Sequence, residues 1–135
     1  MTITLRAVST AGDAGAGVND EVIDKPAGTQ DGDLLLLHVV KYASPTVPFT
    51  VPVGWTQLYE QTDGLFARHG VFWKAASSEP ANYTVTCGAT RALGLSAWTG
   101  VNTGAPINAS ASSASPDYQV PTITWCTLAI RCLRT

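Results

Sequence analysis

The stretch from Asp31 to Val40, DGDLLLLHVV, constrains the fold of this chain more than any other segment. A turn signal, Asp31-Gly32-Asp33, leads directly into four leucines, a histidine and two valines. This apolar run is too short to cross a bilayer, and it has neither a helical cap nor a polar stripe. We therefore predict a central strand that is buried on both faces and around which the other strands pack.

Short segments with strand-like alternation lie on both sides of this run. Tyr83, Val85 and Cys87 alternate with threonines, and Asp63-Gly64 is a strong hairpin signal. Further strands are expected at residues 2–9, 21–24, 55–62, 65–75, 90–98 and 120–133. About seven to nine short strands without a helix predict an all-β fold, an antiparallel β-sandwich with jelly-roll or Greek-key-like connections.

The length and composition fit one small domain with few charges. The 135 residues form a single domain by size. Charged residues make up 13% of the chain, against roughly 25% in an average domain. Either serines, threonines and asparagines keep the surface polar, or a partner covers part of it. The net charge is −2 and no basic stripe exists, which argues against nucleic-acid binding.

The N-terminal sequence MTITLRAVST lacks the apolar core of a signal peptide, and no membrane span is expected. The protein is therefore expected to be made in a cytoplasm. Its cysteines, Cys87, Cys126 and Cys132, are odd in number and have no CxxC spacing. We interpret them as buried, reduced thiols rather than as disulfides or zinc ligands.

The titratable residues show no spacing typical of a metal or cofactor site. His38, within the apolar run, is expected to be a hydrogen-bonded core histidine, and His69 pairs in spacing with nothing obvious. The aspartates around Asp31 and Asp33 are interpreted as turn residues rather than calcium ligands. The sequence thus predicts no metal and no cofactor.

No catalytic constellation is evident either. The serines do not form a GxSxG elbow. Glu60 and Glu79 are the nearest candidates for a pair of hydrolytic carboxylates, and both are expected to be exposed at strand ends or turns. We therefore predict that the chain is not an enzyme.

The tryptophans could build the core or stack on sugars. The core is favoured for Trp73 and Trp98, whereas both interpretations stay open for Trp55 beside its glycine turn. Regular alternation would place Trp55 and Tyr59 on one face. The candidate ligand-binding residues are therefore Trp55, Tyr59 and Trp125, in a carbohydrate-binding module.

Four segments in order, GDLLLLHVV, PVGWTQL, GVFWKAASSEPANYTVTC and RALGLSAWTGVNTGAPI, carry a resemblance to a known family. They resemble a β-sandwich module that is common in structural proteins of tailed phages and prophages. The match covers about residues 30 to 107. None of its recurring elements looks catalytic, since each has a turn or packing role.

The resemblance implies a non-enzymatic virion structural protein, either a capsid decoration (cement) subunit or a tail or fibre component. Its partners would be major capsid or tail subunits and further copies of itself. The short chain, without a long fibre segment, favours decoration. The sequence departs from the module after Ser115, so the strand at 120–133 is either incomplete or completed by a partner. The alternative is a carbohydrate-binding module that recognises a host-surface glycan.

Overall fold

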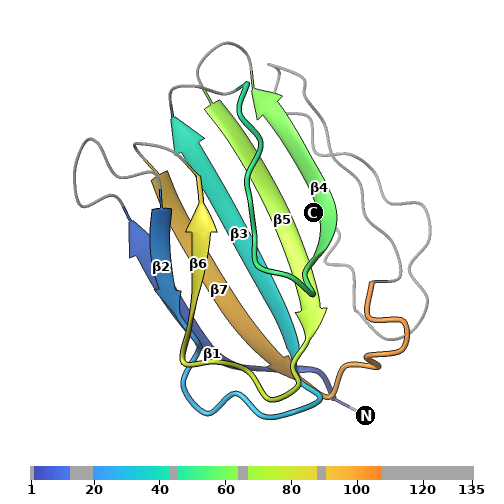
Figure 1. The fold of residues 1–135 in the computed structure, drawn as a ribbon. Coiled ribbons are helices and arrows are strands. Elements are labelled where there is room, and N and C mark those ends of the chain that lie inside the picture. The colour runs from blue at the N-terminus through green and yellow to red at the C-terminus, as the bar shows by residue number, and fades with distance from the viewer. Residues whose placement is uncertain (1, 13–19, 43–45, 64–66, 88–90, 108–135) are drawn as a thin grey trace.

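The computed structural model describes residues 2–12, 20–42, 46–63, 67–87 and 91–107, and the strand expected at 120–133 lies outside them. Within these residues the chain forms seven β-strands and no helix (Figure 1). The strands are β1 (Thr4–Gly12), β2 (Asp20–Asp24), β3 (Leu34–Tyr42), β4 (Thr56–Asp63), β5 (Ala67–Ala75), β6 (Asn82–Thr86) and β7 (Arg91–Thr99).

The strands form two antiparallel sheets packed against each other, which confirms the predicted all-β sandwich. The larger sheet has five strands in the order β1-β7-β3-β5-β4, and the smaller one pairs β2 with β6. In Figure 1, β2 and β6 cross in front of the β1, β7 and β3 side of the larger sheet. We call the side of the larger sheet that faces β2 and β6 the inner face, and the opposite side the outer face.

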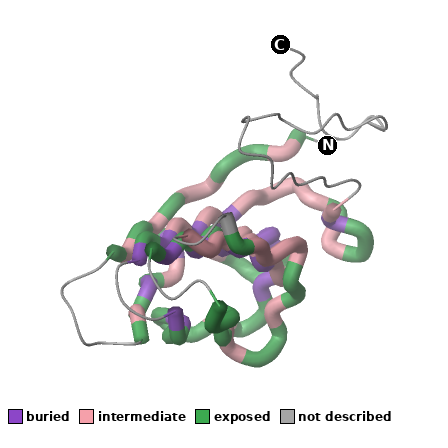
Figure 2. Tube along the Cα trace, turned by 90° about the horizontal axis from the view of Figure 1, so that it is seen from above, coloured by how far each residue is buried: buried purple, intermediate pink, exposed green. Residues whose placement is uncertain are grey.

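Strand β3 is the middle strand of the larger sheet, as the apolar run predicts. Leu35, Leu37 and Val39 point inward and are fully buried. The prediction that both faces are buried is wrong for the second half of the strand, where His38 and Val40 are exposed on the outer face. Figure 2 colours the whole Cα trace by burial. An apolar run alone does not reveal on which face a covering layer lies.

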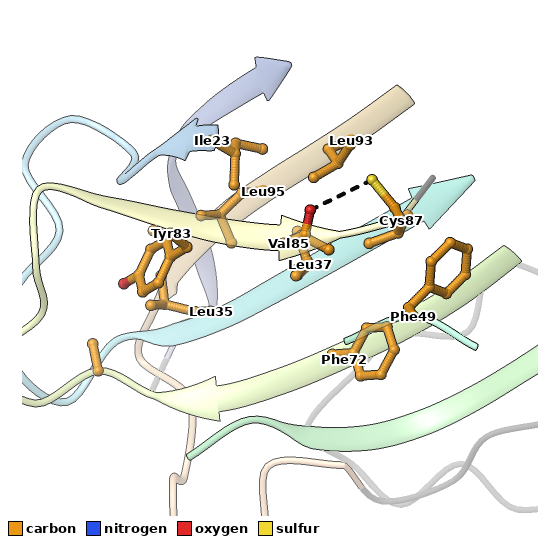
Figure 3. Packing of buried hydrophobic residues seen from close by; sticks show 13 residues of the cluster. Ile23, Leu35, Leu37, Phe49, Phe72, Tyr83, Val85, Cys87, Leu93 and Leu95 are labelled. Atoms are coloured by element: carbon orange, nitrogen blue, oxygen red, sulfur yellow. Dashed lines mark hydrogen bonds between the residues drawn. The ribbon is translucent and has the colours of Figure 1, made fainter. Parts of the chain in front are cut away.

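The core lies between the inner face and the β2–β6 pair. Ile23 of β2, with Tyr83 and Val85 of β6, meets Leu37 and Leu95 of the larger sheet (Figure 3). The pattern of β6 follows the predicted alternation, because its apolar residues are buried and its polar residues exposed. Burying this set of side chains is the main force that holds the two layers together.

Residues 46–55 cover the part of the inner face that β2 and β6 leave open (Figure 1). Phe49 packs edge-on against Phe72 of β5, with ring centroids 6.4 Å apart. Thr50 forms a single β-bridge with Thr86, and Val51 packs against the core cluster. The two prolines of this region, Pro48 and Pro52, explain why it pairs so little, because proline cannot donate to a ladder.

The turn before β3 is fixed by Asp33. Gly32 has a φ of 89°, a conformation that glycine adopts without strain. The Asp33 carboxylate accepts a hydrogen bond from the Gln30 N–H at 2.8 Å and pairs with Arg6 Nε at 2.6 Å. Burial raises the pKa of Asp33, but the hydrogen bonds from Arg6 and Gln30 outweigh it, so the pKa is lowered overall. The predicted turn role of Asp33 is confirmed.

Candidate functional site

Among the described residues, the outer face of the five-stranded sheet is unusual in its composition. Residues that pair across antiparallel strands point to the same side, so the strand registers identify the members of this face. They are Leu5, Val8, Thr10, Gly12, Ala92, Gly94, Ser96, Trp98, Leu34, Leu36, His38, Val40, Tyr42, Ala67, His69, Val71, Trp73, Ala75, Thr56, Tyr59, Gln61 and Asp63.

No lysine, arginine or glutamate belongs to this set, and its one carboxylate position is Asp63, at the end of β4. Its other titratable residues are two histidines and two tyrosines. Val8 is 61% exposed and Tyr42 56%, while Leu36, Val71 and Trp73 are half-buried. No strand among the described residues covers this face. The outer face is therefore a broad surface with little charge and several apolar side chains open to solvent.

A hollow of about 480 Å³ lies on this face. Leu36, His38 and Val71 line it from β3 and β5, Gly94 and Ser96 line it from β7, and Val8 lines it from β1. A side chain added at Gly94 would meet no atom within 4 Å. The missing side chain of Gly94 therefore contributes to the hollow.

Histidines sit at the centre and along one side of this surface. His38 and His69 come from the neighbouring strands β3 and β5. The Tyr59 hydroxyl forms a hydrogen bond of 3.0 Å with Nδ1 of His69, and their rings meet edge to face. Although His38 is open to solvent on one side, loss of hydration against the sheet lowers its pKa, and nearby His69 lowers it further. The neutral form of His38 is favoured as a result.

The structure does not bring the predicted ligand-binding residues together on one face. Tyr59 lies on the outer face opposite Val71, Trp55 packs against the inner core cluster, and Trp125 lies outside the described residues. A β-bulge between Gln57 and Tyr59 explains the separation. The extra residue reverses the alternation of β4, so the expected common face of Trp55 and Tyr59 is wrong.

Trp55 is part of the sandwich rather than of an open platform. Its ring meets Tyr83 edge to face at 5.4 Å, and Lys74 Nζ lies 6.0 Å from the ring centroid. The indole Nε1 is buried and has no hydrogen-bond partner. Trp55 thus closes the core beside β6, and its polar atom is shielded from solvent.

The other two described tryptophans were expected in the core, and that expectation is wrong. Trp73 and Trp98 are half-buried, and both belong to the outer face. Trp98 Nε1 donates a hydrogen bond to Ser96 Oγ at 2.9 Å. These rings add apolar area to the outer face.

The two glutamates expected to be exposed are nearly buried, with 6% and 2% of their side chains accessible. Glu60 accepts hydrogen bonds from Arg68 Nε at 2.6 Å and from the Phe49 N–H at 2.8 Å. Glu79 pairs with Lys74 and accepts a hydrogen bond from the Tyr83 hydroxyl at 2.7 Å. The geometry ties each carboxylate to a different end of the sandwich, where it anchors a loop or turn.

Three cations of the inner face lie in a row at one of its ends. Arg68, Lys41 and Arg91 occupy paired positions on β5, β3 and β7. Arg91 pairs with Glu21 at 2.8 Å, and Lys41 Nζ donates to the carbonyl of Val47. Burial lowers the pKa of Lys41, and neighbouring Arg68 lowers it further. Arg68 pairs within the same sheet, with the glutamate of β4 described above.

Cys87 is a buried free thiol, as predicted, and burial raises its pKa to about 11. Cys126 and Cys132 lie outside the described residues. Within the described part of the chain no three His, Cys, Asp or Glu side chains gather as metal ligands. No helix there is long and apolar enough to span a membrane.

The outer face is formed by alternate positions of neighbouring strands, so the pattern of any single strand does not reveal it. Its signal is nevertheless present in the chain. Alternate positions of β3, β5 and β7 carry no Lys, Arg, Asp or Glu, whereas the charges of these strands fall on the other set of positions. No protein family, curated protein or solved structure with which the chain was compared matches it.

Proposed function

We propose that this chain is a non-enzymatic structural subunit of a tailed-phage virion that contacts other virion proteins through its outer face. The observation that carries the proposal is the absence of charged residues from the outer positions of β3, β5 and β7, together with the exposed apolar side chains of the face. Extended apolar patches on soluble proteins mark interaction surfaces. The resemblance of residues 30 to 107 to a tailed-phage module supports placement in a particle.

A capsid decoration subunit fits better than a tail or fibre component. The described residues build one sandwich, and neither a coiled coil nor an elongated repeat is among them. A decoration protein is bound to the capsid shell in many copies, so it needs a broad contact surface and no reaction centre. The outer face, with five strands, offers such a surface.

The test is the copy number of this chain in purified particles from the genome that encodes it. Quantitative mass spectrometry would measure it against the major capsid protein. Hundreds of copies in a simple ratio to the capsid are expected for decoration. A few to a few tens of copies would instead indicate the tail or fibre. Absence from the particles would overturn the virion proposal.

Glycan binding is a second candidate, and the outer face also carries the observation that favours it. Tyr42 is exposed, and the Tyr59–His69 pair lies on the same face. Aromatic rings beside polar groups are typical of sugar-binding surfaces. Titration calorimetry with host-surface glycans would detect binding that the variant Tyr42→Ala loses. The variant Val22→Thr, changed on β2, is the matched control and should bind like the wild type.

A further inference from the structure

We infer that a second copy of this chain covers the outer face, so that two five-stranded sheets stack face to face about a two-fold axis. The inference concerns the same face as the proposed function and names its partner. It requires no virion, however, so the pure protein tests it separately from the proposed function.

The central strands β3, β5 and β7 carry no charged residue on this face, which makes it suitable for contact with itself. In a two-fold contact the same patch meets itself, so a charged side chain near the axis would approach its own copy. Like charges brought together cost an interface several kcal/mol. The inner face, with Lys41, Arg68 and Arg91 in one row, could not stack on itself in this way. The outer face has no such obstacle.

The size of the face matches that of a stable dimer. Five strands spaced about 4.8 Å apart span about 24 Å, and nine residues extend for about 30 Å. The face therefore measures roughly 700 Å², and two copies would bury roughly 1,400 Å² in total. Specific protein interfaces bury about 1,200–2,000 Å². Stacked sheets about 10 Å apart are a common packing arrangement for such surfaces.

The shape of the outer face also allows the side chains of two copies to interdigitate. Val8 and Tyr42 project from it with most of their side chains exposed, and the hollow over Gly94 lies among the same strands. A projecting group of one copy can fill the hollow of the other, and the symmetry repeats the contact. Filling a hollow with an apolar side chain adds dispersion contacts that the separate chains lack.

Residues 120–133 are a competing occupant, because they are rich in apolar residues. An extended segment is about 5 Å wide, however, and would cover only about one fifth of a face that is about 24 Å across. A second copy covers the whole width at once. The area of the face therefore favours the copy.

The experiment measures the mass of the full chain by sedimentation equilibrium from about 1 to 100 µM. The face variant Val8→Lys/Val40→Lys introduces two charges at outer positions that are 61% and 37% exposed, so folding of a single chain should tolerate them. The control variant Val22→Lys/Val53→Lys makes the same change at exposed valines elsewhere, 52% and 100% exposed. Circular dichroism would verify that both variants fold.

We expect a wild-type dimer, a control variant that dimerises equally well, and a face variant whose dissociation constant rises at least about 100-fold. A wild-type chain that stays monomeric at the highest concentration would overturn the inference, with residues 120–133 or another protein as the occupant. A dimer that the face variant leaves intact, or that both variants weaken equally, would overturn it as well, because the contact would then lie elsewhere.

Discussion

The two faces of the five-stranded sheet differ in where they place charge. The inner face buries Leu35, Leu37 and Val39 along its middle and carries paired charges at its ends. The outer face is built on the same strands, and its positions on β3, β5 and β7 carry no Lys, Arg, Asp or Glu. The inner charges pair with β4, with a loop and a turn, and with the second sheet, which fixes how the sandwich closes. The outer face has no covering layer among the described residues, and its composition is the basis of the proposed contact with another surface.

The largest difference between the faces should appear on truncating neighbouring leucines of β3. Leu37→Ala removes a fully buried inner side chain and should lower the free energy of unfolding by about 2–5 kcal/mol. Leu36→Ala removes a half-buried outer side chain and should cost about 1 kcal/mol in dilute protein. Urea denaturation followed by fluorescence would measure both. Equal losses would mean that the outer face is already covered within one chain.

The next largest loss of stability is expected for the charges at the ends of the inner face. Glu79→Gln weakens the contacts with Lys74, Ser77 and Tyr83 and should cost about 2 kcal/mol at pH 7. Burial raises the pKa of Glu79, but the hydrogen bonds from Lys74, Ser77 and Tyr83 lower it overall. Its stabilisation is therefore complete above the unfolded pKa and is lost as the pH falls through the lower folded pKa. Urea melts at pH 7 and pH 3 should show the variant's deficit shrinking in acid, and a constant deficit would contradict this.

Two glycines allow the same substitution on each face. A Cβ at Gly70, on the inner face, would lie 3.0 Å from Phe72 Cε2 and 3.1 Å from Phe49 Cδ2. Gly70→Ala should therefore lower stability by about 1–3 kcal/mol. At Gly94, on the outer face, the new methyl group meets nothing within 4 Å, so Gly94→Ala should gain about 0.5 kcal/mol. Thermal denaturation would rank the variants, and a destabilised Gly94→Ala would indicate that something fills the hollow in the single chain.

The sequence predicts the layers of this molecule better than its surfaces. Three local patterns led to correct predictions of strands. They are the apolar run of β3, the alternation of β6 and the Asp63-Gly64 signal between the paired strands β4 and β5. The bulge after Gln57 has no local signal, because Leu58 fits regular alternation equally well. It reversed the expected position of Tyr59, and with it the candidate ligand site.

The remaining errors come from contacts between distant parts of the chain. His38 and Val40 were expected to be buried because the run around them is apolar, yet no described strand covers that side. Glu60 was expected to be exposed, yet its partner Phe49 reaches it from a separate loop. Whether a residue is buried depends on which other segment of the chain packs over it. The sequence of a single strand does not contain this information.

The smallest predicted effect is a dependence of self-association on pH. His38 and His69 are the histidines of the outer face, and the Tyr59 hydroxyl is hydrogen-bonded to His69. Loss of hydration and nearby His69 lower the pKa of His38, so its contribution to stability is complete above the ordinary value of about 6.5 and declines as the pH falls below it. Protonation on both copies would also place like charges in the stacked contact.

Lowering the pH from 8 to 5 should therefore weaken the dimer about tenfold, or about 1.4 kcal/mol. Sedimentation equilibrium at the two pH values would measure the change. His38→Gln keeps a polar side chain but cannot gain a proton, so its dissociation constant should respond less to pH than that of the wild type. The inner face carries no histidine among the described residues, so a dimer equally strong at both pH values would place the contact away from the outer face.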